Sequence, residues 1–387
     1  MPRKRMNACR AACLTLAFAA IMAGMPAHAV EPKPYIAPAW LPGGHLQTIY
    51  THLLIRAPRV TYRRERLELD DGDFLDFDWV DGVAGQPVVV LFHGLEGSSD
   101  SHYARDLMHA VQQRGWTGVV AHFRGCSGED NRLPRAYFAG DSAEIERILR
   151  HVKSRHPDTP LHAVGVSLGG NALLKWLGES GAAAQTLVTR AAAVSAPLDL
   201  TAAGNALDQG FNRNVYTARF LATLKAKSLR KADTFPGLLD ADAIQAATTF
   251  REFDTLVTAR LHGFVDADDY WQKNAAKPLL KSVAVPTLVI NAKNDPFLPV
   301  SALPAPTDVS PMVVLEQPDG GCRAKGVQDG VERRWAQGCA QDDRRGVRQR
   351  RTVLRRRRHR GIHRVGPEGE GAGVHLGYRA LLRQGVY

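Results

Sequence analysis

Hydrophobic and polar residues alternate with several different periods along the chain, and each period predicts a type of secondary structure. In residues 64–80 (RERLELDDGDFLDFDWV), apolar and polar residues alternate around an Asp-Gly pair, which predicts a β-hairpin. Residues 86–94 (QPVVVLFHG) form a continuous apolar run that ends in glycine, as expected of a buried strand. Strands and helices then alternate, with strands predicted at 116–125, 161–166 and 191–197 and helices at 103–115, 141–156 and 168–180. This alternation predicts βαβ units and an α/β fold, with a mostly parallel central sheet flanked by helices.

The pattern becomes helical between residues 199 and 275, which predicts a helical cap insertion over one end of the sheet. Apolar runs typical of strands resume at 285–297 and 312–318, and no clear core pattern follows them. The predicted organisation is an α/β domain over residues 30–318 that includes the cap over 199–275. A disordered, Arg-rich tail is predicted over residues 319–387.

The positive charge of the chain is concentrated at its C-terminal end. The 387 residues have a net charge of +11, and residues 320–387 contain 17 Lys and Arg against 6 Asp and Glu. The preceding 319 residues carry 33 charges of each sign, so the body of the protein is neutral overall. With 44% hydrophobic residues in the whole chain, a substantial core is expected. Nucleic acid is not expected as a partner of the body, and its binding would depend on the tail.

Residues 1–29 have the organisation of a secretory signal peptide, with a basic start, an apolar run and an Ala-His-Ala sequence before Val30. The apolar run is short for a membrane span, which needs about 20 residues, and no other segment predicts a span. We expect either an exported, periplasmic protein or, if translation begins at Met25, a cytoplasmic one. Cys126 is the only cysteine between this leader and the tail, so no disulfide framework is predicted in the body.

The sequence Gly165-Val166-Ser167-Leu168-Gly169 fits the G-x-S-x-G pattern of a nucleophilic serine. It lies directly after a predicted strand and before a predicted helix, where small residues permit a tight turn that exposes the Ser167 hydroxyl. The N–H of Leu168, at the start of the helix, would donate to a developing oxyanion. An ordinary strand-to-helix turn is the alternative, and the strand–turn–helix context favours the nucleophile.

A second glycine turn, His93-Gly94-Leu95-Glu96-Gly97, ends an earlier predicted strand. It would bring the N–H of Leu95 near Ser167 as the second donor of an oxyanion hole. His93 would lie on the oxyanion side of the serine, so a hydrogen-bonded structural role is favoured over a role as the base.

Asp295 comes just after a predicted strand and is a candidate for the acid of a catalytic triad. A carboxylate there would orient an imidazole and stabilise its protonated form. An ordinary Asp-Pro turn is the alternative, but the position downstream of Ser167 agrees with the order Ser…Asp…His. A histidine should follow the next predicted strand, and none occurs until His359. The general base is therefore missing, and a serine hydroxyl without one is a poor nucleophile.

Six motifs together resemble the YheT-like branch of the α/β-hydrolases, which includes eukaryotic ABHD-type acylglycerol lipases. They are AWLPGGHLQT, VVLFHGLEGSSDSHYA, GVVAHFRGCSGEDNR, GVSLGGN, REFDTLVTARLHGF and AKNDPF, all between residues 39 and 318. The resemblance implies an α/β-hydrolase fold with Ser167 as nucleophile, Asp295 as triad acid and Leu95 as an oxyanion donor. It also implies hydrolysis of a small-molecule or lipid carboxylic ester, such as an acyl ester or monoacylglycerol, without a cofactor. No metal site is expected, because the chain contains no H-E-x-x-H sequence.

The chain departs from this family at the third triad position. The family has a G-G-H-x-G-F-like turn there, whereas this chain reads Gly-Gly-Cys-Arg, so Cys322 replaces the expected base. The abrupt change to an Arg- and Gly-rich sequence favours a reading-frame shift near codon 320 and predicts a catalytically impaired chain. His375 is a less favoured substitute base, because it lies 80 residues beyond Asp295. The alternative function is a non-catalytic α/β-hydrolase scaffold whose basic arm binds nucleic acid or an anionic surface.

Overall fold

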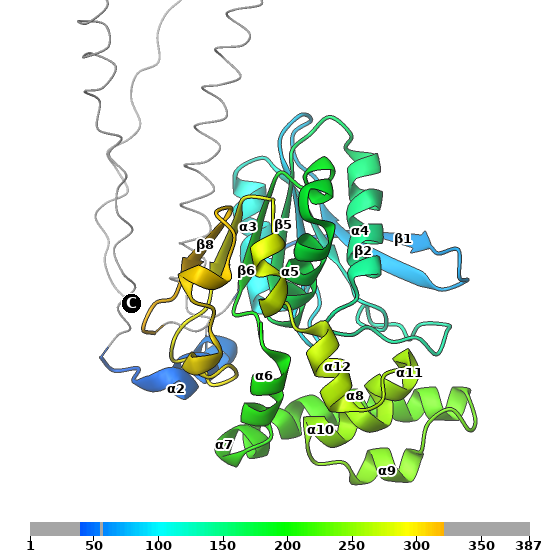
Figure 1. The fold of residues 1–387 in the computed structure, drawn as a ribbon. Coiled ribbons are helices and arrows are strands. Elements are labelled where there is room, and N and C mark those ends of the chain that lie inside the picture. The colour runs from blue at the N-terminus through cyan, green and yellow to red at the C-terminus, as the bar shows by residue number, and fades with distance from the viewer. Residues whose placement is uncertain (1–38, 55–56, 321–387) are drawn as a thin grey trace, which may run out of the picture. The chain divides into compact units, whose positions relative to one another are not determined.

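A single eight-stranded sheet forms the centre of the computed structural model, which describes residues 39–54 and 57–320 (Figure 1). The strands are β1 (Arg63–Glu68), β2 (Phe74–Val80), β3 (Val88–Phe92), β4 (Thr117–Ala121), β5 (Leu161–Val166), β6 (Arg190–Val194), β7 (Thr287–Ile290) and β8 (Val313–Glu316). Their order across the sheet is β1-β2-β4-β3-β5-β6-β7-β8. β2 pairs antiparallel with β1 and with β4, and all other neighbouring strands are parallel. The prediction of a mostly parallel sheet is confirmed.

The predicted hairpin consists of β1 and β2. Its turn contains Gly72 with φ 86°, a left-handed conformation that glycine adopts without steric cost. All seven residues of β2 are buried, including two aspartates. Each of these carboxylates pairs with an arginine of β1, Asp76 with Arg66 and Asp78 with Arg64. These pairs compensate the cost of burying charge between two strands.

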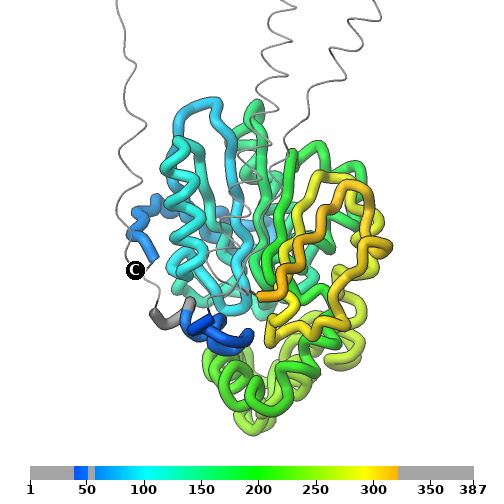
Figure 2. The backbone as a smooth tube through the Cα atoms, turned by 90° about the vertical axis from the view of Figure 1, so that its left-hand side faces the viewer, coloured from blue at the N-terminus to red at the C-terminus, as the bar shows by residue number. Residues whose placement is uncertain are grey.

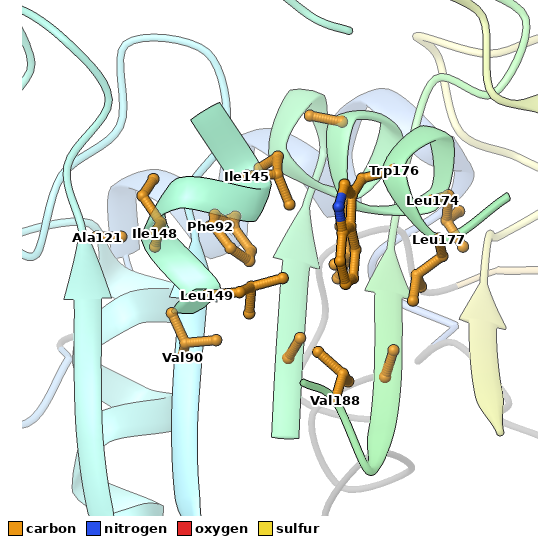
Figure 3. Close-up of a cluster of buried hydrophobic side chains, with 14 of the residues drawn as sticks. Val90, Phe92, Ala121, Ile145, Ile148, Leu149, Leu174, Trp176, Leu177 and Val188 are labelled. Atoms are coloured by element: carbon orange, nitrogen blue, oxygen red, sulfur yellow. The ribbon is translucent and has the colours of Figure 1, made fainter. Parts of the chain in front are cut away.

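Helices α4 (Ser142–Arg155) and α5 (Leu168–Ser180) cover one face of the sheet (Figure 3). Alternate residues of the strands face these helices, as the two-residue period of a strand requires. The core cluster between the two layers includes Val90, Phe92, Ala121, Ile145, Ile148, Leu149, Leu174, Trp176, Leu177 and Val188. This cluster fixes the position of α5 over the central strands.

Helix α3 (His102–Gln113) packs on the opposite face. An added Cβ at Gly118 of β4 would lie 2.6 Å from the sulfur of Met108 and 3.1 Å from a methyl of Val111, both in α3. The next residue, Val119, belongs to the cluster under α4 and α5, so the two neighbours point to opposite faces. The prediction that helices flank the sheet is therefore confirmed.

Between β6 and β7 the chain forms a layer of helices beyond the carboxyl ends of the strands, here called the cap (Figures 1 and 2). Several of these helices begin at an Asp or Thr whose side chain accepts a backbone N–H, which stabilises the helix start. The cap contains α6 (Leu200–Leu207), α7 (Gly210–Asn212), α8 (Ala218–Thr234), α9 (Ala241–Ala246), α10 (Phe250–Phe253), α11 (Arg260–His262) and α12 (Ala267–Asn274). Two π-helical turns, Arg213–Thr217 and Asp254–Ala259, connect them.

The structure also contains elements that the sequence pattern did not predict. Helix α2 (Gly43–Leu54) begins within the motif AWLPGGHLQT, which indicates only a family resemblance, and continues beyond it. In the cap, Gly263 has φ 75° and ends α11, and Asp266 then begins α12, so the helical segment is divided there. Short 3₁₀ turns occur at Gly181–Thr186, Lys277–Ser282, Val300–Ala302 and Pro306–Asp308. The 3₁₀ elements have only one or two turns and are too short for a hydrophobic period to reveal them.

The predicted leader, residues 1–29, and the predicted tail beyond residue 320 lie outside the described residues. Within the described part of the chain, no helix combines the length and the apolar character needed to cross a bilayer. The last strand of the described chain is β8. Just after it, the carbonyl of Pro318 accepts the N–H of Lys293 at 2.8 Å, which ties this segment to the residues after β7.

Candidate active site

Ser167 lies at the turn between β5 and α5. Its backbone has φ 53° and ψ −121°, a conformation that is strained for any residue with a side chain. The Ser167 N–H donates to the carbonyl of Val194 at 2.9 Å. Its carbonyl accepts from the N–H groups of Gly170 and Asn171 at 2.9 and 3.1 Å. Hydrogen bonds to β6 and to α5 thus hold the strained turn. Ser167 also lines a cavity, whose other lining residues include several from the cap.

The two glycines of the G-x-S-x-G sequence permit a close approach of α5 to the strands. A Cβ at Gly165 would lie 2.5 Å from the carbonyl oxygen of Gly169. A Cβ at Gly169 would lie 2.5 Å from the carbonyl oxygen of His93. Both separations are far shorter than a van der Waals contact, so any larger residue would displace the helix. These positions require glycine because of the close approach, and not because of their own φ.

The turn after β3 passes directly beside the serine. A Cβ at Gly94 would lie 3.1 Å from the Cβ of Ser167. The N–H of Gly94 donates to the hydroxyl of Tyr103 at 2.9 Å. The N–H groups of Leu95 and Leu168 have no acceptor among the described residues, and both residues line the same cavity as Ser167. Two unused donors next to one hydroxyl are the arrangement that an oxyanion hole requires.

Backbone strain in the described part of the chain gathers at this edge of the sheet. The non-glycine residues with positive φ there are Glu96 (54°), Ser167 (53°) and Ser195 (50°). They follow β3, β5 and β6, and all three line the cavity. The N–H of Glu96 donates to the Tyr137 hydroxyl at 2.9 Å, and that of Ser195 donates to the carbonyl of Ile290 at 2.8 Å. Strain that is held in place by such bonds is typical of a functional site.

Asp295 follows β7 and lines the same cavity. It is only 7% exposed. Its N–H donates to the carbonyl of Ala292 at 3.2 Å, and its Oδ1 accepts from the N–H of Phe297 at 2.9 Å. These bonds form a tight turn that fixes the carboxylate near the edge of the sheet. The structure thus brings together, around one cavity, the residues singled out in the sequence: Leu95, Ser167, Leu168 and Asp295.

His93 is buried, and both of its ring nitrogens are engaged. Nδ1 lies 2.8 Å from the carbonyl oxygen of Gly94, and Nε2 accepts from the N–H of Phe123 at 3.0 Å. This pair of bonds requires the neutral ring with its proton on Nδ1. Burial lowers the pKa of His93 to about 3, because the charged form is poorly solvated there. His93 therefore joins β3 to the residues after β4 and has no nitrogen free to accept a proton from Ser167.

His262 of the cap is the one histidine among the described residues that line the cavity, and His93 is not part of the lining. Its ring packs against Phe138, with the ring centroids 4.4 Å apart. The position predicted for the base, Cys322, and the position of its less favoured substitute, His375, lie outside the described residues.

The cavity has a volume of about 210 Å³ and is mainly apolar. Its apolar lining includes Leu95, Phe138, Leu168, Leu200, Leu207, Phe220, Leu224, Phe250, Val257, Trp271, Phe297 and Leu298. Its polar lining includes an ion pair between Lys227 Nζ and Glu96 Oε1, which lie 2.9 Å apart. Such a chamber suits an apolar chain held next to a few polar groups. No cluster of three or more His, Cys, Asp and Glu side chains that could hold a metal occurs in the described ranges.

A family model for the alpha/beta hydrolase fold matches residues 87–323. The chain belongs to the α/β-hydrolase family. This α/β-hydrolase is 43% identical over 282 residues to "Putative esterase YheT" of Escherichia coli (strain K12), which covers 72% of this chain and 82% of that protein. It is 30% identical over 286 residues to the human protein Phospholipase ABHD3, which covers 72% and 69%. It is 26% identical over 290 residues to Monoacylglycerol lipase ABHD2 of Danio rerio, which covers 71% and 69%. The resemblance to the YheT-like and ABHD-type branch is confirmed.

Some residues that support the site were not identified from the sequence. Tyr103 and Tyr137 hold the turn after β3 by accepting backbone N–H groups, and nothing local in the sequence connects them to that turn. Lys227 and Lys231 line the cavity from α8. Their spacing of four residues places them on one face of a helix, so helical periodicity offered a signal for this pair.

The close contact at Gly169 predicts a specific loss of stability. Gly169→Ala places a methyl group against the carbonyl oxygens of Phe92 and His93, so we expect the free energy of unfolding to fall by about 1–3 kcal/mol. Glu179→Ala, an exposed position on the same helix, should change it by less than about 0.5 kcal/mol. Urea denaturation followed by circular dichroism measures both. Equal stabilities of the two variants would contradict the close approach.

The buried neutral His93 predicts a loss of stability in acid. Between the ordinary histidine pKa of about 6.5 and the folded pKa of about 3, His93 is protonated in the unfolded chain and neutral in the folded chain. The contribution of His93 is therefore fully present above pH ~6.5 and is lost as the pH falls toward ~3. His93→Gln should reduce the slope of unfolding free energy against pH by about 1.4 kcal/mol per pH unit between pH 6 and 4.

Val90→Ala provides the matched control for this measurement. Val90 lies in β3, three residues before His93, and its replacement removes buried apolar volume without removing a titrating group. It should lower the free energy of unfolding and keep the slope of the unmodified chain. A slope unchanged in His93→Gln would show that His93 is not held neutral.

Proposed function

We propose that the chain is by descent a serine hydrolase of carboxylic esters, with Ser167 as its nucleophile. The observation that carries this proposal is the strained turn of Ser167 beside the unused N–H groups of Leu95 and Leu168. Attack of the Ser167 oxygen on an ester carbonyl would place negative charge on the carbonyl oxygen, and these two N–H groups would donate to it. The alcohol leaves, and water then cleaves the acyl-enzyme.

The proposed substrate is an acyl ester or a monoacylglycerol-type lipid. The largely apolar lining of the cavity supports this class, because burial of an acyl chain there removes apolar surface from water. The names of two relatives, a phospholipase and a monoacylglycerol lipase, agree with a lipid ester. The cap supplies most of the apolar wall and would therefore govern which acyl chains fit.

Asp295 is the proposed triad acid. Its carboxylate, fixed by the turn after β7, would accept the N–H of a histidine and stabilise the imidazolium that forms when Ser167 attacks. We propose that this histidine was lost at Cys322 through a reading-frame shift near codon 320. Loss of the base lowers kcat of a serine hydrolase by about 10⁴–10⁶-fold, so the chain as written would be impaired.

The first activity prediction concerns the chain as written. We expect it to hydrolyse p-nitrophenyl butyrate scarcely faster than the uncatalysed reaction, because no base activates the Ser167 hydroxyl. Release of p-nitrophenol, followed by absorbance, measures this rate, and Ser167→Ala should have the same rate. Rapid turnover that Ser167→Ala abolishes would contradict the impairment and would make His375 the base to test.

A second prediction concerns the coding sequence. We expect another reading frame downstream of codon 320 to encode a G-G-H-x-G-F-like turn, which sequencing of codons 310–330 and translation in all frames would reveal. A chain with that continuation should have a kcat about 10⁴-fold or more above that of the present chain.

Two serine variants of the restored chain test the nucleophile. Ser167→Ala should abolish the gain in kcat. Ser195→Ala, at the end of the next strand and lining the same cavity, should keep most of it. If the two variants lose activity equally, Ser167 is not the specific nucleophile. If no frame encodes a histidine turn, the frame-shift proposal fails and the tail is authentic.

A further inference from the structure

Four carboxylates line the cavity in the described part of the chain, and three of them have an evident role. Glu96 pairs with Lys227, whose Nζ lies 2.9 Å from Oε1, and Asp130 pairs with Arg230. Asp295 is the proposed triad acid. The fourth carboxylate belongs to the cap and has neither a cationic partner nor a place in the proposed reaction.

This fourth carboxylate is Asp254, the first residue of the π-helical turn Asp254–Ala259. Its Oδ1 accepts from the hydroxyl of Thr258 at 2.7 Å, and its Oδ2 accepts from the indole N–H of Trp271 at 2.8 Å. Both donors are neutral, and no Lys, Arg or His of the described residues forms an ion pair with Asp254. An ionised carboxylate has about four acceptor positions, so two donors leave part of its capacity unused.

Asp254 can be reached from the cavity. It lines the cavity and is half-buried, so the residue retains accessible surface. Its chain neighbours Phe253 and Val257 belong to one apolar cluster of the cap, and its partner Trp271 belongs to another. The cap thus places a negative charge between two apolar clusters, where water competes weakly for it.

The charge of Asp254 has a cost that its own contacts do not explain. Burial is the main cause that raises the pKa of Asp254 to about 6; the bonds from Thr258 and Trp271 oppose this rise, and the negative charge of Asp208 adds to it. The carboxylate is therefore ionised at neutral pH although it is desolvated. A neutral acceptor could satisfy the same two donors without that cost. A perturbed carboxylate in a cavity is typical of a group that acts on a ligand.

The charged groups around the π-helical turn do not neutralise Asp254. Arg251 of α10 pairs with Asp268 of α12. Burial raises the pKa of Tyr270 well above its ordinary value and lowers that of His262 to about 4, so both are mainly neutral between about pH 5 and 8. The remaining charged side chains of α9 to α12 make no hydrogen bond or ion pair with Asp254: Asp242, Glu252, Arg260, Asp266, Asp269 and Lys273.

We propose that Asp254 is the anchor of a cation subsite in the cap, which binds a protonated primary amine carried by the substrate. This inference deepens the proposed ester hydrolysis and rests on it for the role of the subsite. The ammonium group would donate to the free acceptor positions of Asp254, and the apolar portion of the ester would fill the cavity. Among acyl esters, the subsite would select those that carry such an amine, and no phosphate is part of this chemistry.

Binding of two ligands of equal chain length to the full 387-residue chain tests the subsite. Isothermal titration with octylamine and octan-1-ol compares a cationic with a neutral hydrogen-bond donor on one alkyl chain. We expect octylamine to bind about tenfold or more tightly at about pH 8, as a charge-assisted hydrogen bond implies. Equal affinities would overturn the proposal, because the carboxylate would then recognise no charge.

The pH dependence of the same titration needs no variant. Octylamine stays protonated from about pH 8 to 5, as a lysine side chain does, whereas Asp254 is protonated as the pH falls through its pKa of about 6. About a tenth of Asp254 is ionised at pH 5, so the preference for octylamine should fall from about tenfold to about twofold. Binding of octan-1-ol should not change. A preference for octylamine that is the same at both pH values would overturn the subsite.

Two aspartates of the cap give a matched pair of variants. Asp254→Asn should weaken octylamine binding about tenfold and leave octan-1-ol binding unchanged, because the cavity remains and only the charged hydrogen bond is lost. Asp268→Asn removes the same charge from α12, but Asp268 does not line the cavity, so both affinities should be unchanged. Equal effects of the two variants would show that Asp254 makes no direct contact with the amine.

The same titrations separate this inference from the proposed function. Ligand binding needs no nucleophile, so Ser167→Ala should keep the preference for octylamine. If the restored chain hydrolyses esters but shows no such preference, the subsite is wrong and the hydrolase proposal stands. If the preference depends on Asp254 but no form of the chain cleaves an ester, the cation subsite stands and the hydrolase proposal fails.

Discussion

The direct contact between the start of α5 and the ends of β3 and β5 is the constraint on which the site depends. Gly165 and Gly169 place no side chain between α5 and the strands, so the helix starts directly against the sheet. The chain therefore turns from β5 into α5 at one residue. That residue is Ser167, whose strained φ follows from the contact. The same contact brings the turn at Gly94 against the serine side chain. One packing contact thus produces both the exposed hydroxyl and the donors beside it.

A network of buried ion pairs holds the elements around this contact. Arg124, after β4, is almost fully buried and pairs with Asp73 in the hairpin and with Glu144 at the start of α4, each at 2.8 Å. A buried arginine is stable only when its donors are satisfied, so these carboxylates must remain in place. The hairpin, the loop after β4 and α4 are therefore fixed relative to one another by charge, in addition to the apolar core under α4 and α5.

The cap contributes a different kind of chemistry from the sheet. The sheet edge supplies backbone N–H groups, the serine and a carboxylate, all held by short turns. The cap supplies mostly apolar side chains, together with Lys231 and His262. Because the sheet edge carries the features proposed for catalysis and the cap carries those proposed for recognition, changes in the cap can alter the ligand without altering the turn at Ser167.

The sequence by itself determined the alternation of strands and helices, the turn at Ser167 and the place of Asp295 after a strand. These features are local, because hydrophobic period, glycine and turn residues act over a few neighbouring positions. Only the tertiary structure decided that His93 is neutral, since its two partners, Gly94 and Phe123, lie on different segments. It also decided that Lys231 and His262 line one cavity, because α8 and α11 are brought together by packing of the cap. Contacts between distant segments depend on that packing, which no local pattern encodes.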